Sequence, residues 1–156
     1  MIQWATYVIF CLALVAVSFS LKLKVSNRLK KQYMRLIENS MKEGASQDLM
    51  KSWCIVSISY TDPEYRNLES FIYGYTDHEV IVLLTAPEWL CETMKKKFYT
   101  HANIHSTQAD WLIPFRNRRE IAIIDRKGKI SRSTNFSILN YGVQMMNGKR
   151  GRNNGM

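Results

Sequence analysis

The chain has 156 residues, of which 46% are hydrophobic, 12% aromatic and 22% charged, and its formal net charge is +9. This length allows one small domain with its flanking segments. The hydrophobic and aromatic content is too high for a disordered chain, and three cysteines are too few for a secreted scaffold held together by disulfides. The folded part is therefore expected to be stabilised by burial of its apolar side chains.

The positive charge is concentrated outside the middle of the chain. Residues 1–21 carry no charged side chain, residues 22–43 carry a net charge of +5, and the tail from Gln144 adds +3, which leaves +1 for residues 44–143. A basic segment beside an apolar one predicts attraction to anionic lipid headgroups, whereas a nucleic-acid-binding protein carries its charge on its folded surface. We therefore expect membrane lipids and no nucleic acid as partners. The expected membrane-surface residues are Lys22, Lys24, Arg28, Lys30, Lys31 and Arg35.

The first segment is apolar on every side, from Trp4 to Leu21 (WATYVIFCLALVAVSFSL). With the three residues before it, it makes an uncharged run that can span about 30 Å of hydrocarbon as a helix. A cleaved signal peptide is the alternative, but it would carry positive charge before the apolar run and small residues after it. We therefore expect a single transmembrane anchor at residues 1–21, in a cell membrane.

The basic residues after the anchor predict which side of the membrane holds the rest of the chain. Lys and Arg next to a spanning helix tend to stay in the cytoplasm, so charge alone places the folded domain inside the cell. Residues 22–46 are expected to form a basic juxtamembrane helix or linker, helical from Ser26 to Glu43. A domain at residues 47–147 and a disordered basic tail at 148–156 are expected to follow.

From Trp53 onward, strand-like and helix-like patterns alternate, which predicts an α/β domain with a central mixed sheet flanked by helices. Pro63 is expected at the first turn of the first helix, and Gly74 is expected to end that helix. After the second helix we expect a loop that contains His101 and His105. The expected strands are 54–60, 79–84, 121–126 and 130–133, and the expected helices are 64–73, 88–98 and 141–146.

The order strand, helix, strand, helix, hairpin and helix, with Ile-Asp-x-x-Gly-x-Ile at residues 124–130, resembles a thioredoxin-like domain. With its anchor and basic segment, the chain is similar to the membrane-anchored thioredoxin-like proteins of bacteria, the TlpA-like and methylamine-utilisation accessory group. The resemblance implies a domain outside the cytoplasm and a role in the maturation or export of secreted peptides or proteins. This location is opposite to the one that the charge rule predicts.

The chain lacks the two cysteines that such domains carry at the start of the first helix, where the helix dipole favours a thiolate. The resemblance implies the pattern Thr-Cys-Pro-x-Cys-Lys, and Asp62 and Tyr65 occupy its two cysteine positions in the segment 61–66 (TDPEYR). The resemblance therefore implies a degenerate, redox-inactive site. From its residue type alone, Asp62 is expected to cap the helix that follows.

A second departure concerns Arg119. The family resemblance implies a cis-proline six residues before the Asp of the hairpin motif, and counting back from Asp125 gives Arg119. Arg119 could therefore reach Asp62 or Glu64 across the site and form a salt bridge there. The alternative is that Arg119 belongs to a solvated arginine-rich loop at residues 116–119.

These observations favour a binding or accessory protein with a protein or peptide partner in a membrane system, rather than an enzyme. The expected binding groove consists of Asp62, Pro63, Glu64, Tyr65 and Arg119. One alternative is a thiol-dependent oxidoreductase that uses Cys54 or Cys91 alone, and another is a structural subunit of a membrane complex. No catalytic residue, metal or cofactor is expected, because no Gly-rich phosphate loop follows a strand and His101 and His105 have no third ligand at a fixed spacing.

Overall fold

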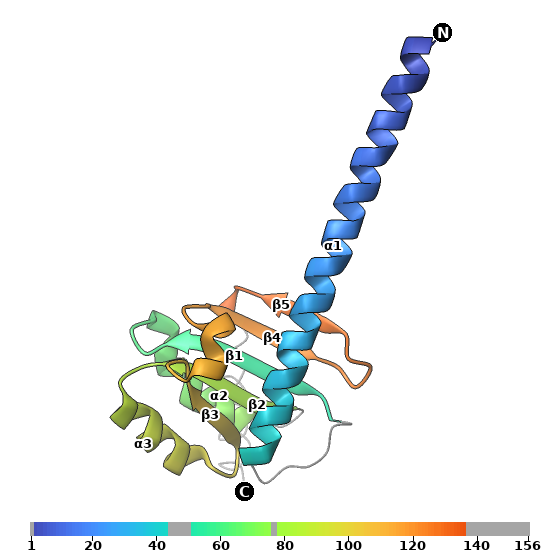
Figure 1. Cartoon of the computed structure of the whole chain (residues 1–156). Coiled ribbons are helices and arrows are strands. Elements are labelled where there is room, and N and C mark those ends of the chain that lie inside the picture. The colour runs from blue at the N-terminus through green and yellow to red at the C-terminus, as the bar shows by residue number, and fades with distance from the viewer. Residues whose placement is uncertain (1, 44–50, 76–77, 137–156) are drawn as a thin grey trace, which may run out of the picture. The chain divides into compact units, whose positions relative to one another are not determined.

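The computed structural model describes residues 2–43, 51–75 and 78–136 (Figure 1). The chain divides into two compact units, Met1–Asn39 and Ser40–Met156, and each is described by itself. The expected helix at 141–146, the end of the expected juxtamembrane linker at 44–46 and the expected basic tail at 148–156 lie outside the described residues.

One helix, α1 (Ile2–Glu43), contains both the apolar segment and the basic segment. Neither Gly nor Pro interrupts it, so the two predicted helical segments form one continuous helix. Its large apolar side chains from Tyr7 to Val25 are 50–73% exposed, which is far more apolar surface than a soluble protein leaves to water. By length and composition, α1 can cross a bilayer.

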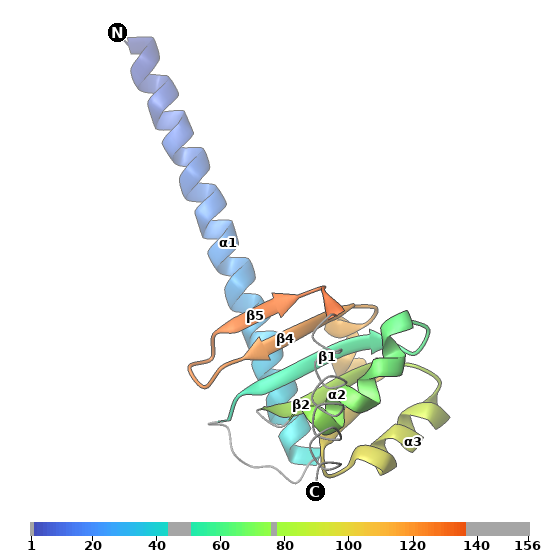
Figure 2. The same ribbon diagram turned by 180° about the vertical axis from the view of Figure 1, so that it is seen from behind.

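The second unit contains one mixed sheet of five strands in the order β3-β2-β1-β4-β5 (Figure 2). β1, β2 and β3 are parallel, whereas β4 is antiparallel to β1 and β5 is antiparallel to β4. Val56 in β1 lies between Val82 of β2 and Ile121 of β4. The strands are β1 (Trp53–Ser59), β2 (Glu79–Thr85), β3 (Ala102–Ser106), β4 (Glu120–Ile124) and β5 (Ile130–Ser133).

The four predicted strands are confirmed. β1 and β2 are buried on both faces, as expected for nearly continuous runs of apolar and β-branched residues at the centre of a sheet. The β4–β5 turn explains the Ile-Asp-x-x-Gly motif. Asp125 Oδ1 accepts hydrogen bonds from the backbone N–H groups of Lys127 and Lys129, both at 2.9 Å, and Gly128 adopts φ 73°, which glycine tolerates best.

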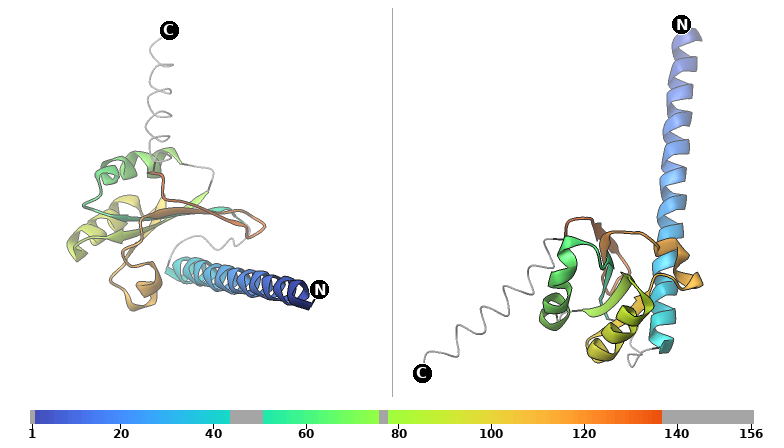
Figure 3. Two further views of the ribbon diagram at one scale, coloured as in Figure 1. Left: turned by 90° about the horizontal axis from the view of Figure 1, so that it is seen from above. Right: turned by 90° about the vertical axis from the view of Figure 1, so that its left-hand side faces the viewer.

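The helices of this unit lie on both sides of the sheet, with α2 and α3 on one side and η2 on the other (Figure 3). Leu68, Phe71 and Ile72 of α2 share a buried core with Cys91 and Phe98 of α3 and with the strand side chains beneath them. The predicted helix at 88–98 is confirmed, whereas the predicted helix at 64–73 is divided into a 3-10 helix and an α-helix. These elements are η1 (Pro63–Asn67), α2 (Leu68–Gly74), α3 (Glu88–Phe98) and η2 (Asp110–Phe115).

The predicted loop after α3 is wrong, because β3 and η2 occupy most of it. The segment of β3 (ANIHS) has little strand propensity by itself. Its backbone instead pairs with β2, with Ile104 opposite Val82, and Ala102 and Ile104 join the core under α3. Tertiary contacts with β2 therefore determine this strand.

Candidate functional site

Two groups of polar side chains lie at opposite ends of the sheet, and strand direction explains both. Residues that follow a strand lie at one end of the sheet. Residues that precede a neighbouring antiparallel strand lie at the same end. The pairing of β1 with β4 ends at Ser57 and Glu120, so residues 60–66 lie at the same end as Arg118 and Arg119. We call this the carboxyl end of the sheet and the other the amino end.

At the carboxyl end, Asp62 makes two different contacts with its two carboxylate oxygens. Oδ1 accepts a hydrogen bond from the backbone N–H of Glu64 at 2.9 Å, so Asp62 is the predicted N-cap, here of the 3-10 helix η1. Oδ2 accepts a hydrogen bond from Arg119 Nε at 2.5 Å. Of the two partners that the sequence suggested for Arg119, the structure selects Asp62.

This pair changes the electrostatics of the carboxylate. The hydrogen bond from Arg119, helped by the backbone N–H of Glu64, holds the pKa of Asp62 below its usual range. Only 9% of the Asp62 side chain is exposed, against 49% for Arg119, so the acid is nearly covered and the guanidinium still meets solvent. Asp62 is therefore charged at neutral pH and is a weak candidate for proton transfer.

Arg119 also contacts the end of the β4–β5 hairpin. Its Nη1 donates to the carbonyl oxygen of Thr134 at 2.9 Å, and its guanidinium lies 4.3 Å from the centre of the Phe136 ring. The planar guanidinium thus connects η1 with the segment after β5. A lysine at this position could not make both contacts in the same fixed geometry.

The other three residues of the predicted groove are in the same turn but have different surroundings. Pro63 is exposed at the first position of η1, where it needs no N–H donor. Glu64 accepts a hydrogen bond from Asn67 Nδ2 at 2.8 Å. Tyr65 packs partly against the core, and burial raises the pKa of its phenol. The structure therefore brings Asp62, Arg119 and the start of η1 together, with the Tyr65 ring directed partly toward the core.

The two cysteines of the folded unit are buried. Burial raises the pKa of Cys54 to about 12, although a hydrogen bond with Tyr75 partly offsets the effect. Burial also raises the pKa of Cys91. Thiolate is the reactive form of cysteine, so both thiols are poorly suited to nucleophilic or redox chemistry at neutral pH.

The two histidines of the former loop are separated by the strand. His101 is exposed before β3, whereas His105 lies within β3, is 6% exposed and packs edge-on against Trp111 with ring centres 5.2 Å apart. In extended backbone, residues four apart are about 13 Å apart, which is too far for one metal ion. Among the described residues, no group of three His, Cys, Asp or Glu side chains is placed to hold a metal.

The predicted membrane-surface residues all lie on α1. Their side chains are exposed along the helix that continues directly from the apolar segment. An exposed cation on such a helix is available to an anionic headgroup. The residues concerned are Lys22, Lys24, Arg28, Lys30, Lys31 and Arg35.

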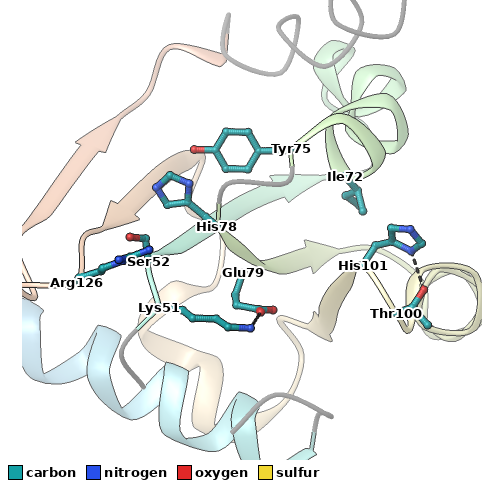
Figure 4. Close-up of a pocket in the computed structure, with 9 residues that line it drawn as sticks. All are labelled: Lys51, Ser52, Ile72, Tyr75, His78, Glu79, Thr100, His101 and Arg126. Carbon is teal, nitrogen blue, oxygen red and sulfur yellow. Dashed lines mark hydrogen bonds and ion pairs between the residues drawn. The ribbon is translucent and has the colours of Figure 1, made fainter. Parts of the chain in front are cut away.

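The amino end of the sheet contains a cavity of about 370 Å³ that sequence reasoning missed (Figure 4). Its polar side chains precede or begin the three parallel strands or follow the antiparallel strand β4, so the strand order brings them together. If the strand order had been known, the sequence positions of these residues would have indicated that they lie together. The lining residues are Lys51, Ser52, Ile72, Tyr75, His78, Glu79, Thr100, His101 and Arg126.

Comparisons with protein-family models, with curated proteins and with solved structures give no match to this chain. The two ends of the sheet are therefore interpreted from their own geometry.

Proposed function

We propose that this chain is a single-pass membrane protein whose folded unit is a redox-inactive, thioredoxin-like binding domain. The observation that carries the proposal is the Asp62–Arg119 pair. It occupies the turn in which a thioredoxin-like enzyme would hold its dithiol, and it replaces a reactive centre with a charged, hydrogen-bonded one. In this proposal the domain acts by binding a protein or peptide at the carboxyl end of the sheet.

The order of the elements supports the thioredoxin-like assignment. β1 leads into η1 and α2, β2 leads into α3, and the β4–β5 hairpin pairs with the far edge of β1. The hairpin carries its Asp and Gly at the two positions where the turn requires them. In this assignment Asp62 occupies the first cysteine position and Arg119 the position of the expected cis-proline. These two residues lie beside each other and form an ion pair.

The thiols support binding rather than chemistry. A lone-cysteine oxidoreductase needs an accessible thiol with a depressed pKa, and Cys54 and Cys91 are both buried with raised pKa values. The surface around Asp62 instead offers a half-exposed guanidinium and an exposed proline, which suit contact with a peptide.

In this proposal α1 anchors the chain, and the basic residues that follow the apolar segment contact anionic lipids. Such an anchor would hold the binding surface near other proteins of the same membrane. We propose a role as an accessory protein in the maturation or export of secreted peptides or proteins in a bacterial envelope.

Site-specific photo-cross-linking in intact cells tests the binding surface. A benzophenone amino acid at Arg66, exposed on η1, is expected to give a discrete cross-linked product, which Arg119→Gln should reduce. The same group at Lys127, exposed in the β4–β5 turn, is the control. Equal products from both positions, or a product unaffected by Arg119→Gln, would contradict the proposed surface.

A single labelling experiment tests the side of the membrane. Lys127→Cys with Cys11→Ala leaves one exposed thiol in the folded unit, because Cys54 and Cys91 are buried. Reaction with a membrane-impermeant maleimide on intact cells would place the domain outside the cytoplasm and support the envelope role. Reaction only after lysis would place it in the cytoplasm and contradict that role.

A further inference from the structure

We infer that the outer edge of β5 binds an extended peptide segment that carries acidic side chains. β5 (Ile130–Ser133) is the last strand of the sheet, so one of its edges pairs with β4 and the other faces outward (Figure 2). Among the described residues, no strand pairs with this outer edge. The surface includes neither Asp62 nor Arg119, so the inference does not rest on the proposed function.

The register of the β4–β5 hairpin determines which backbone groups point outward. The backbone N–H of Asp125 donates to the carbonyl oxygen of Lys129 at 3.1 Å, so these two residues form a hydrogen-bonded pair. Such pairs alternate along an antiparallel ladder, and the next residue of β5 that bonds to β4 is therefore Ser131. The N–H and C=O groups of Ile130 and Arg132 point to the outer edge, where an added strand can pair with them.

β5 is open along this edge and is fixed at both ends. The side chains of residues 131–133 are exposed. At the start of the strand, Asp125 Oδ1 accepts a hydrogen bond from the backbone N–H of Lys129 at 2.9 Å, and at its end the backbone N–H of Asn135 donates to Ser133 Oγ at 3.0 Å. A strand that is already held in extended form loses little conformational entropy when it binds a partner.

The hairpin concentrates positive charge. Its four cations are Arg126, Lys127, Lys129 and Arg132. Residues 125–135 carry a net charge of +3, whereas residues 44–143 as a whole carry +1, so the remainder of that stretch carries −2. The one acid of the hairpin is Asp125, whose Oδ1 accepts hydrogen bonds from two backbone N–H groups of the turn. Electrostatic complementarity therefore favours an acidic partner.

Two of these cations lie beside the outer edge, one on each face of the sheet. Side chains alternate along a strand, so Arg132 lies on the same face as Ile130, and Lys129 lies on the opposite face with Ser131. The Arg132 side chain is 47% exposed, and its Nη1 makes only a long contact with Glu120 Oε2, at 3.5 Å. An acidic residue on either face of an added strand would lie across from one of these cations, where opposite charges stabilise a sheet.

Charge also distinguishes an acidic peptide from two other occupants of this edge. A second copy of the chain would bring together two hairpins that each carry +3, and like charges on neighbouring strands destabilise a sheet. The chain's own residues 137–156 contain three cations and no acid, so they have the same sign as the hairpin. Cations on an edge strand prevent unspecific pairing, and an acidic strand is the partner that the same cations attract.

Amide hydrogen exchange tests pairing at the outer edge directly. The full-length protein in detergent micelles is measured by NMR alone, with a blocked octapeptide of alternating Val and Glu, and with the same peptide carrying Lys in place of Glu. Without peptide, the amides of Ile130 and Arg132 should exchange faster than that of Ser131, which bonds to β4. A saturating amount of the acidic peptide is expected to slow both by about tenfold or more, and the Lys peptide should not. Unchanged exchange with the acidic peptide, or equal slowing by both peptides, would overturn the inference.

Two pairs of variants separate an edge site from general attraction to a basic hairpin, with affinity measured by fluorescence anisotropy of the labelled acidic peptide. Lys129→Gln is expected to weaken binding by about two- to fivefold, and Lys127→Gln, which removes an equal charge in the turn outside the strand, should weaken it less. Arg132→Gln and Arg132→Pro remove the same charge, but only proline removes the outward N–H, so the proline variant should bind more weakly. Equal affinities within either pair would contradict strand addition at this edge.

Discussion

Arg119 and Asp62 are 57 residues apart in sequence, yet Nε of the arginine donates to Oδ2 of the aspartate at 2.5 Å. The antiparallel pairing of β4 with β1 makes this contact possible, because the chain reaches Arg119 directly before β4 and Asp62 shortly after β1. The same carboxylate caps η1 through its other oxygen. One acidic side chain thus stabilises a local turn and a long-range contact together.

The first prediction concerns the energy of this pair. Asp62→Ala removes both the cap and the ion pair and is expected to lower the free energy of unfolding by about 1–2 kcal/mol. Arg119 is about half exposed, so solvent screening limits the coupling between Asp62→Asn and Arg119→Gln to about 0.5–1 kcal/mol. Urea unfolding of the two single variants and the double variant measures this coupling, and strictly additive effects would show that the contact contributes nothing.

The second prediction is the pH dependence of that coupling. The pKa of Asp62 is lowered in the folded protein, chiefly by the hydrogen bond from Arg119, relative to about 3.9 in an unfolded chain. The stabilisation is therefore fully present above the unfolded pKa and is lost as the pH falls through the folded value. The difference in stability between the wild type and Asp62→Asn should shrink with acidification, and a difference that persists at the lowest accessible pH would contradict the assigned cause.

The third prediction tests the thioredoxin-like assignment by restoring the missing dithiol. The backbone N–H of Tyr65 donates to the carbonyl oxygen of Asp62 at 3.0 Å, which closes a turn and brings the two Cα atoms within about 7 Å. This separation allows a disulfide. Asp62→Cys combined with Tyr65→Cys is expected to form a reversible disulfide and to catalyse the reduction of insulin by dithiothreitol.

The matched control for the restored dithiol is Asp62→Cys combined with Glu64→Cys, which places the second thiol one position earlier in η1. It should show little of either property. Equal activity in both double variants would mean that any pair of exposed thiols suffices, and the assignment would lose its chemical support.

The fourth prediction concerns thiol reactivity. Cys54 and Cys91 are buried with raised pKa values, so both should resist iodoacetamide at neutral pH and react fully in denaturant. Mass spectrometry of tryptic peptides measures each site separately. Rapid alkylation of either residue in the folded protein would favour the alternative hypothesis of a lone-cysteine oxidoreductase. Cys54→Ala and Cys91→Ala would then be tested for loss of function.

Local patterns predicted the elements that have a clear apolar pattern or strong boundary residues. The uncharged run of α1, the apolar run of β2 and the helix between Pro87 and Tyr99 all have such patterns, so their positions follow from local physics. Asp62 was predicted as a cap for the same reason, because its partner N–H belongs to the next residues along the chain.

Tertiary structure decided what depends on partners that are distant in sequence. β3 is a strand because β2 offers it backbone partners, and its own residues favour no such structure. The choice of Asp62 over Glu64 as the partner of Arg119 required the register of β4 against β1. The amino-end cavity required the order of four strands, since its lining residues come from segments as far apart as Lys51 and Arg126. Hydrophobic periodicity records which side chains are buried, but it contains no information about which strand pairs with which, and that pairing brings each of the two groups of polar side chains together.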